Sequence, residues 1–288
     1  MFETVSVIGG DLRQLTLAKL LLKEGYRLYL YGFDKDMVPD APASGDDVQT
    51  ALDADLVILP VPVTFDGIYI NSPYAEKPVS IEEFLEKLNP SSIVFGGQIK
   101  SDLASRLDEK GIAYRDYLKR EELAIRNAVP TAEGAIEIAI AETPITLHGS
   151  KCLVLGYGRI GKILSKMLAA IGAQTFVEAR KYADLAMIEG HGYEPVSLGE
   201  LKSRIGEFDI IFNTVPAMIL DEELLRLIKK DALIIDLASK PGGVDMKSAK
   251  EIGVKVIWAL SLPGKIAPVT SGAIIKDTIM NILNGLEV

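Results

Sequence analysis

The sequence predicts an α/β protein of two doubly wound domains, each built on a parallel sheet, with an interdomain cleft. Three observations predict this fold class. Short apolar runs alternate with helix-like stretches, the alternation occurs in two series, and a glycine-rich turn joins a strand to a helix near residue 156. Apolar runs separated by helical segments are typical of parallel strands that are covered on both faces.

The first series begins with TVSVI at residues 4–8, followed by GGD and a stretch with leucines on one helical face. Further strands are expected at RLYLYG, DLVILPVPV, SIVFGG and AYRDY, because each is short, apolar and bounded by turn residues. The segment TFDGIYINSPYAEKP, residues 64–78, has neither pattern. It is therefore either a lid or an ordered surface loop.

The second series begins with KCLVLG at residues 151–156. The helix after it is well defined, because its apolar residues fall on one stripe and Gly172 closes it. Strands are expected at TFVEA, DIIFNTV, LIIDLA and VKVIWAL, with a helical stretch, DEELLRLIKK, among them.

The boundary between the two series is expected at residues 127–130, where Pro130 suits the start of a connecting helix. After Pro268, a last helix has an apolar stripe that needs a partner, so we expect it to return to the first domain. The predicted N-terminal α/β domain, flavodoxin-like or Rossmann-like, therefore covers residues 1–128 and is joined by the C-terminal helix 270–288. The second predicted domain, a Rossmann domain, covers residues 129–269.

Composition excludes several classes of protein. With 288 residues, 48% of them hydrophobic and 25% charged, the chain is globular rather than disordered. The net charge of −9 disfavours nonspecific binding to nucleic acid or anionic membranes, and no apolar run is long enough for a membrane span. One cysteine and two histidines disfavour a disulfide framework and a zinc site. We therefore expect a cytoplasmic protein with no metal, nucleic-acid or membrane partner.

The turn GYGRIG follows an apolar strand and precedes an amphipathic helix, as in dinucleotide-binding units. Its first glycine makes the tight turn, the second lets the backbone approach a pyrophosphate, and the third lets helix and strand pack closely. The helix N-terminus presents N–H groups and partial positive charge to phosphates. The predicted cofactor contacts here are Gly156, Tyr157, Gly158, Arg159, Ile160 and Gly161.

The residues at the end of the next strand distinguish NADP from NAD. In NAD sites, a carboxylate about 20 residues past the turn binds the ribose 2′-hydroxyl. Ala179 stands at that position, and Arg180 and Lys181 follow it. Because a guanidinium forms a charge-assisted fork with a 2′-phosphate, we predict NADP, with NAD less favoured. NAD stays an alternative cofactor, because Glu178 would reach the ribose if the register were shifted by one residue.

Ligands of open α/β sheets bind at the carboxyl ends of the strands. Three later strands end in loops of small, polar or turn-forming residues, which are predicted to line the ribose and the nicotinamide. The predicted contacts in these loops are Thr214, Val215, Pro216, Ala238, Ser239, Lys240, Leu262, Pro263 and Gly264.

The first strand of the chain ends in a different glycine turn, GGDLRQ, which does not fit the dinucleotide pattern. A glycine turn at a helix start can still receive a carboxylate, with Arg13 adding charge. The predicted substrate contacts are Gly10, Asp11, Arg13, Gln14 and Arg126. Lys265 is a further cation for an anionic substrate.

Seven segments of the chain carry a family resemblance. They are VIGGDLRQ (7–14), GFDKD (32–36), NAVPTAEGAIEIAI (127–140), HGSKCLVLGYGRIG (148–161), NTVPAMIL (213–220), DLASKPGGVD (236–245) and LPGKIAPVTSG (262–272). Through them the chain resembles the A subunits of dipicolinate synthase over essentially its whole length. Its two-domain plan is also similar to that of D-2-hydroxyacid and alanine dehydrogenases, whose active sites lie in the interdomain cleft.

The resemblance implies NADP-dependent oxidation of a dihydro- or tetrahydrodipicolinate intermediate to pyridine-2,6-dicarboxylate during sporulation, in the cytoplasm of the mother cell. It also implies a partner, the flavoprotein-like B subunit. This chemistry releases a proton, so a general base is required. On placement alone the catalytic candidates for the base are Asp11 and Glu133. Lys265 is a third catalytic candidate, as a cation.

Two other functions remain open. A dehydrogenase of a small 2-hydroxy or 2-amino acid would share the fold, although the loops lack an evident Arg–Glu–His set for that chemistry. A non-catalytic NADP(H)-binding module that regulates the B subunit would share the cofactor turn. The apolar terminal helix is compatible with a homo-oligomer and equally with docking inside the chain.

Overall fold

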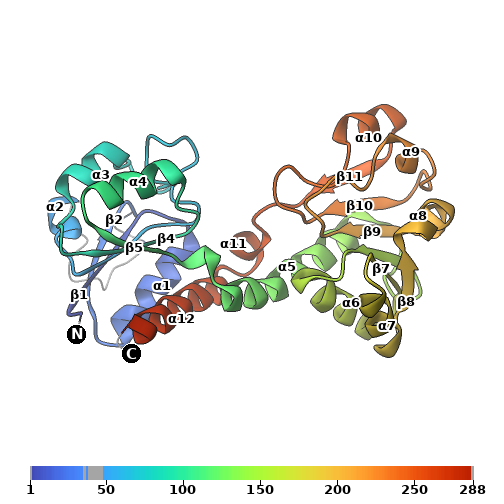
Figure 1. Ribbon diagram of the computed structural model, residues 1–288, viewed down its shortest axis with the longest axis horizontal. Helices are drawn as coiled ribbons and strands as arrows, with labels where there is room; N and C mark the ends of the chain where they lie inside the picture. Colours follow the sequence, from blue (N-terminus) through green and yellow to red (C-terminus); the bar gives the residue numbers. More distant parts are fainter. Residues whose placement is uncertain (1, 35–36, 38–47, 287–288) are drawn as a thin grey trace. The chain divides into compact units, whose positions relative to one another are not determined.

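Figure 1 shows the computed structural model, which describes residues 2–34, 37 and 48–286. The chain divides into two compact units. Unit 1 is Met1–Arg126 with Ala267–Val288, and unit 2 is Asn127–Ile266. Residues 35 and 36, the end of the segment GFDKD, lie outside the described residues. Within the described ranges, no helix has the length and apolar character that a membrane crossing requires.

Unit 1 contains a sheet of five parallel strands in the order β2-β1-β3-β4-β5. The strands are β1 (Thr4–Ile8), β2 (Arg27–Tyr31), β3 (Leu56–Ile58), β4 (Ile93–Gly96) and β5 (Ala113–Asp116). The order is that of flavodoxin-like folds, and the parallel sheet predicted for this half is confirmed. Strand β3 is shorter than the run DLVILPVPV suggests, because Pro60 and Pro62 have no N–H for the ladder.

Helices cover both faces of this sheet. They are α1 (Leu12–Lys23), α2 (Val48–Leu52), α3 (Ile81–Lys87), α4 (Ser101–Glu109), the short 3₁₀ helix η2 (Tyr117–Lys119) and α12 (Pro268–Leu286). The C-terminal helix α12 lies beside α1 (Figure 1), and Ile275 and Ile279 join Leu17 in one core. At the crossing, a Cβ added to Gly272 would lie 2.4 Å from the Arg13 carbonyl oxygen, so glycine permits this close approach.

Unit 2 contains six parallel strands in the order β11-β10-β9-β6-β7-β8. They are β6 (Lys151–Leu155), β7 (Gln174–Ala179), β8 (Glu194–Ser197), β9 (Ile210–Asn213), β10 (Leu233–Asp236) and β11 (Lys255–Trp258). The order matches dinucleotide-binding folds, so the doubly wound prediction is confirmed here too. The run EPVS, which forms the edge strand β8, was not predicted because it is short, polar and contains Pro195.

The helices of unit 2 form layers on the two faces of its sheet. They are α6 (Arg159–Ile171), α7 (Tyr182–Gly190), α8 (Leu198–Arg204), η3 (Ile205–Glu207), α9 (Glu222–Leu225), α10 (Met246–Ile252) and α11 (Leu262–Ile266). Successive residues of β6 alternate between two cores: Val154 belongs to one, while Leu153 and Leu155 belong to the other. This alternation explains why the buried strand reads as a continuous apolar run.

Helix α5 (Glu121–Glu142) connects the two units and corrects one prediction. Pro130 does not begin this helix but lies inside it, nine residues after its start. A proline in a helix interior costs about 3 kcal/mol because it removes one hydrogen bond and crowds the preceding turn. Buried alanines on both sides of it, Ala128 and Ala132, show that packing outweighs this cost. The helix predicted over DEELLRLIKK, residues 221–230, is also shorter than expected, since only Glu222–Leu225 form a helix, α9.

Candidate functional site

The glycine turn of unit 2 has room for nothing larger than glycine at two positions. Gly156 ends β6 with φ of +90°, and a Cβ added to it would lie 2.6 Å from Val215 Cγ2. A Cβ at Gly161 would lie only 2.0 Å from the Gly156 carbonyl oxygen. The predicted roles of these glycines, a tight turn and close helix–strand packing, therefore agree with the geometry.

The N-terminus of α6 is open at the middle glycine. Gly158 is the N-cap and has no side chain to accept hydrogen bonds from the first turn. A Cβ added at Gly158 would meet no described heavy atom within 4 Å, and the first turn of α6 contains no acidic residue. An uncapped helix N-terminus beside open space provides N–H donors and positive potential for an anion. The pyrophosphate contact at this helix N-terminus stays a prediction.

The end of β7 presents cations at the surface. Ala179 is buried, whereas Arg180 and Lys181, the N-cap of α7, are exposed. Glu178 is only 3% exposed, and its Oε1 has no hydrogen-bond partner among the described residues. Burial raises the pKa of the Glu178 carboxyl above its ordinary value, opposed by a backbone N–H of Gly156 and by the charge of Arg180. A buried alanine therefore stands where an NAD site would present a carboxylate, and exposed positive charge follows directly after it.

A tyrosine–histidine pair anchors the turn. The Tyr157 hydroxyl and His191 Nδ1 are 2.6 Å apart, and Lys162 Nζ lies 5.4 Å from the centre of the Tyr157 ring. Burial raises the pKa of Tyr157. His191 caps the C-terminus of α7, so the pair joins the glycine turn to the helix that begins beside Arg180. The sequence places His191 in a Gly-His-Gly turn, but it did not indicate the contact with Tyr157, because the two residues are 34 positions apart.

Buried polar residues tie together the loops that follow β9 and β10. Thr214 Oγ1 donates to the Leu155 carbonyl at 2.8 Å, at the start of the glycine turn. Asn213 Nδ2 donates to Asp236 Oδ1 at 2.8 Å, and the Val215 N–H donates to Asn213 Oδ1. The loop of the predicted contacts Thr214, Val215 and Pro216 is thus anchored to both neighbouring strands.

Asp236 organises the next loop. Its carboxylate is 1% exposed and accepts hydrogen bonds from the N–H groups of Ala238 and Gly243. Trp258 Nε1 donates to the Ala238 carbonyl at 2.9 Å, while Ser239 and Lys240 are exposed. The sequence patterns did not single out Asn213, Asp236 or Trp258 as supports, although polar residues at the ends of buried strands were the available signal.

The third loop differs from the prediction. Leu262, Pro263 and Gly264 belong to the short helix α11, and Leu262 is buried. A Cβ added to Gly134 of α5 would lie 3.2 Å from Leu262, so Leu262 takes part in the packing of α11 against α5. A cofactor contact for these three residues stays a prediction.

The glycine turn of unit 1 is closed by the chain's own groups. The N–H groups of Gly9 and Gly10 donate to the carbonyls of Tyr31 and Asn71, each at 2.8 Å. Asn71 lies in the segment 64–78, and its own N–H donates to the Val63 carbonyl, so this part of the segment is hydrogen-bonded to the rest of unit 1. The Asp11 carboxylate caps α1 by accepting the Arg13 N–H at 2.9 Å.

The predicted substrate contacts in this turn mostly bind one another. Arg13 Nε and Nη2 donate to the Asp11 carboxylate, and Nη2 also donates to the Val61 carbonyl at 2.8 Å. Gln14 is fully buried and completes the capping box with Asp11. Its Nε2 donates to the Tyr117 hydroxyl, whose pKa burial raises strongly. A substrate carboxylate would have to use donors beyond these contacts.

The other three candidates are surface residues within their own units. Arg126 forms an ion pair with Asp277 at 3.2 Å, with both side chains about half exposed. Glu133 on α5 and Lys265 on α11 are exposed. Catalytic roles for Asp11, Glu133 and Lys265 stay predictions.

Neither metal nor thiol chemistry is suggested by the described part of the chain. No group of three His, Cys, Asp or Glu side chains in it could hold a metal ion. Cys152 is buried in β6, and burial raises the pKa of its thiol to about 11, far from that of a reactive cysteine.

Known proteins match both halves of the chain. The family model of the N-terminal domain of the dipicolinate synthase A subunit matches residues 4–118, and "D-isomer specific 2-hydroxyacid dehydrogenase, NAD binding domain" matches residues 107–244. The dipicolinate synthase A subunit of Bacillus subtilis (strain 168) is 35% identical over 286 residues, covering 98% of this chain and 96% of that protein.

Two solved structures agree with these matches. The crystal structure of the dipicolinate synthase A chain from Bacillus subtilis has a TM-score of 0.87 at 34% identity, covering 100% of this chain and 97% of that one. The crystal structure of its counterpart from Bacillus halodurans has a TM-score of 0.88 at 31% identity, covering 98% and 97%.

Proposed function

Since the chain belongs to the family of dipicolinate synthase A subunits, we propose that it oxidises a dihydro- or tetrahydrodipicolinate intermediate to pyridine-2,6-dicarboxylate with NADP as the acceptor. The family match over residues 107–244 indicates a nicotinamide cofactor and an oxidoreductase domain. The choice of NADP over NAD, the cyclic dicarboxylate substrate and a catalytic role for this chain are our proposals.

One observation carries the NADP proposal: an uncapped helix N-terminus lies one strand away from two exposed cations. The backbone around Gly158 would bind the pyrophosphate, and Arg180 would bind the 2′-phosphate, assisted by Lys181. Glu178 is buried on the sheet face that also carries Phe176, opposite the face of Ala179. It therefore offers no exposed carboxylate that would repel a 2′-phosphate.

The proposed reaction makes modest demands on the protein. When bound, the nicotinamide would supply the acceptor for a hydride from the substrate ring. Oxidation of dihydrodipicolinate then releases one proton and leaves an aromatic ring, so the chain must position the substrate, neutralise two carboxylates and accept the proton. For the carboxylates we propose Arg126 and Arg13, the latter through a donor beyond its contacts with Asp11 and the Val61 carbonyl, with Lys265 as a further cation. Asp11 and Glu133 are the proposed acceptors of the proton.

From the family alone, we also propose a complex with the flavoprotein-like B subunit, formed in the cytoplasm of the mother cell during sporulation. The match to a 2-hydroxyacid dehydrogenase domain favours one second candidate, a dehydrogenase of a small 2-hydroxy acid.

Arg180→Ala tests the cofactor proposal. One charge-assisted contact contributes about 1.5–3 kcal/mol, so the affinity for NADP⁺ should fall about tenfold to a hundredfold while the affinity for NAD⁺ stays the same. Titration calorimetry with both nucleotides measures this. Lys166→Ala, which removes an exposed cation of α6, is the matched control. An unchanged preference for NADP⁺ in Arg180→Ala would contradict the assignment.

The activity itself is tested with purified chain, NADP⁺ and freshly generated dihydrodipicolinate. We expect NADPH and the ultraviolet absorbance of the pyridine ring to appear together, in the absence of the B subunit. Nucleotide binding without product would identify a non-catalytic role. Turnover only on linear 2-hydroxy acids would establish the second candidate instead.

A further inference from the structure

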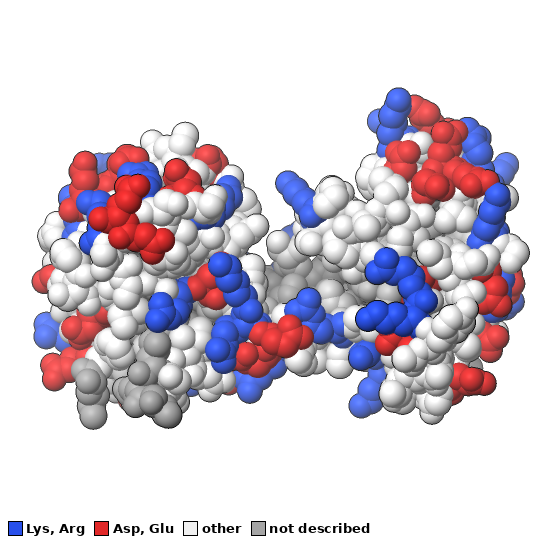
Figure 2. Space-filling model, in the orientation of Figure 1, with Lys and Arg blue, Asp and Glu red and all other residues white. Residues whose placement is uncertain are grey.

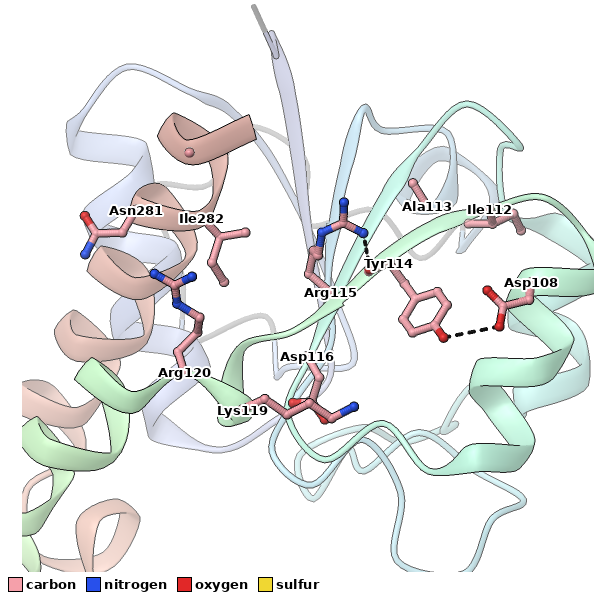
Figure 3. A pocket seen from close by; sticks show the side chains of 11 residues that line it. Asp108, Ile112, Ala113, Tyr114, Arg115, Asp116, Lys119, Arg120, Asn281 and Ile282 are labelled. Carbon is pink, nitrogen blue, oxygen red and sulfur yellow. Dashed lines mark hydrogen bonds between the residues drawn. The ribbon is translucent and has the colours of Figure 1, made fainter. Parts of the chain in front are cut away.

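A hollow of about 640 Å³ follows the outer edge of unit 1's sheet (Figure 3). All four residues of β5 line it, and the last turns of α12 form its far wall through Asn281, Ile282 and Gly285. Strand β5 is an edge strand, paired only with β4. One side of its backbone therefore has no strand partner among the described residues of unit 1, and the hollow lies along this strand.

Three cations surround this edge. Arg115 projects from the middle of β5, and Lys119 and Arg120 follow on η2 and just after it (Figure 3). Arg120 pairs with Glu122 at 2.8 Å. Arg115 Nη1 donates to the Tyr114 carbonyl at 2.8 Å, and neither Arg115 nor Lys119 has a carboxylate partner within the described residues.

The two carboxylates of the hollow are engaged with the chain itself. Asp116 accepts the N–H groups of Gln98, Ile99 and Leu118, so both of its oxygens are used. Asp108 accepts the Tyr114 hydroxyl at 3.4 Å. The edge therefore offers cations and main-chain groups, while the floor is apolar through Ile112 and Ile282.

Charged side chains on an edge strand commonly protect a sheet from aggregation. Protection alone, however, does not require a hollow with an apolar floor beside the strand. An extended segment that adds to β5 would gain main-chain hydrogen bonds, bury apolar side chains against Ile282 and pair acidic side chains with Arg115 and Lys119. An extended segment that carries both acidic and apolar side chains would make all three contributions.

We propose that the β5 edge of unit 1 docks an extended acidic segment of the second subunit of the synthase. The assembly with the B subunit comes from the proposed function, whereas the place and chemistry of the contact come from this edge. The chain has a net charge of −9, and acidic and basic side chains are interspersed on the face of unit 1 seen in Figure 2. The two cations that have no carboxylate partner among the described residues, Arg115 and Lys119, would therefore determine where an acidic segment binds.

The double variant Arg115→Glu/Lys119→Glu tests the site. Its affinity for the purified cognate B subunit, measured by interferometry at low salt, should fall at least about tenfold, because like charges then face each other. The matched control, Lys19→Glu/Lys77→Glu, reverses two exposed lysines of the same unit and should bind as the wild type does. Thermal unfolding of both variants shows whether unit 1 remains folded.

Hydrogen exchange gives a second measurement that needs no variant. The bound partner should slow the exchange of amides at residues 113–116, since an added strand protects the edge. Unchanged binding by the double variant, or no protection at β5, would overturn the proposed docking site but would leave the proposed NADP-dependent oxidation unaffected. If the wild-type chain failed to bind the B subunit, both the site and the proposed assembly would be overturned. A change in self-association of the double variant alone would instead identify an edge that pairs two copies.

Discussion

Each unit begins its sheet with a strand, a glycine turn and a helix, but the two turns treat the helix N-terminus differently. In unit 1, the Asp11 side chain caps α1 and pairs with Arg13. In unit 2, Gly158 caps α6 with no side chain, and a Cβ there would meet open space. One helix N-terminus is filled by the chain's own carboxylate, and the other is left for an anion from outside.

The difference shows that topology alone does not make an anion site. Both turns have glycines with positive φ, at Gly9, Gly10 and Gly156, and both lie at the carboxyl end of the first strand of their sheet. A helix N-terminus attracts phosphates only while its N–H groups are not already satisfied. We therefore expect the residue type at the N-cap to decide whether such a turn binds an anion.

Gly161→Ala should have the largest effect on this comparison. The added Cβ would lie 2.0 Å from the Gly156 carbonyl oxygen, a backbone atom that cannot move away without opening the turn. We expect a loss of about 3 kcal/mol or more in the free energy of unfolding, together with loss of nucleotide binding. Urea unfolding measures the first and calorimetry the second.

Gly158→Ala is the matched control for that variant, because its Cβ meets no described atom within 4 Å. It should unfold nearly as the wild type does. Equal destabilisation by the two alanines would contradict the steric distinction between the two glycines.

Gly158→Asp should convert the second turn into a copy of the first. A carboxylate at the N-cap would accept the first-turn N–H groups and repel a pyrophosphate. We expect nucleotide affinity to fall about a hundredfold, equivalent to about 2.7 kcal/mol. Stability should rise by a few tenths of a kcal/mol at most. Gly158→Asn, which caps without charge, should lose less affinity, and equal losses would show that charge is not the cause.

Asp11→Ala should affect stability but not nucleotide binding. Removing the cap costs about 1–2 kcal/mol of unfolding free energy, and it also leaves the Arg13 guanidinium without its carboxylate. Chemical denaturation measures the loss. Asp11→Asn keeps a capping oxygen and should recover part of it. Normal catalysis in Asp11→Asn would exclude Asp11 as the proton acceptor.

Periodicity and spacing were sufficient to predict the parts of the structure that depend on residues close together in the sequence. Short apolar runs predicted the two parallel sheets, because strands buried on both faces need apolar side chains at every position. The pattern GYGRIG predicted its own geometry, since Gly161 is constrained by the Gly156 carbonyl oxygen within the turn and Gly156 has a φ of +90°. These predictions needed little knowledge of distant residues.

Contacts between distant residues could not be predicted in the same way. The Tyr157–His191 bond joins residues 34 positions apart, and the Asn213–Asp236 bond joins residues 23 positions apart. Pro130 was misread because local propensity favoured a helix start, whereas burial of neighbouring alanines continued the helix through it. In each case the deciding energy comes from packing that a linear pattern does not contain.

Glu178→Gln addresses the remaining difference between the turns, the buried carboxyl beside Gly156. Burial raises the pKa of Glu178 above 4.5, so the folded state holds this proton more tightly than the unfolded state does. The stabilisation from that proton is complete below the unfolded pKa and is lost as the pH rises through the folded pKa. Glutamine resembles the protonated acid at every pH.

Wild type and Glu178→Gln should therefore unfold alike near pH 4, and the variant should become the more stable of the two as the pH is raised. Thermal unfolding from about pH 4 to pH 8 measures the difference, with Glu137→Gln, at an exposed position of α5, as the control. A difference that does not change with pH would mean that the pKa of the Glu178 carboxyl is the same in the folded and unfolded states, with the effect of burial offset by the Gly156 N–H and by Arg180.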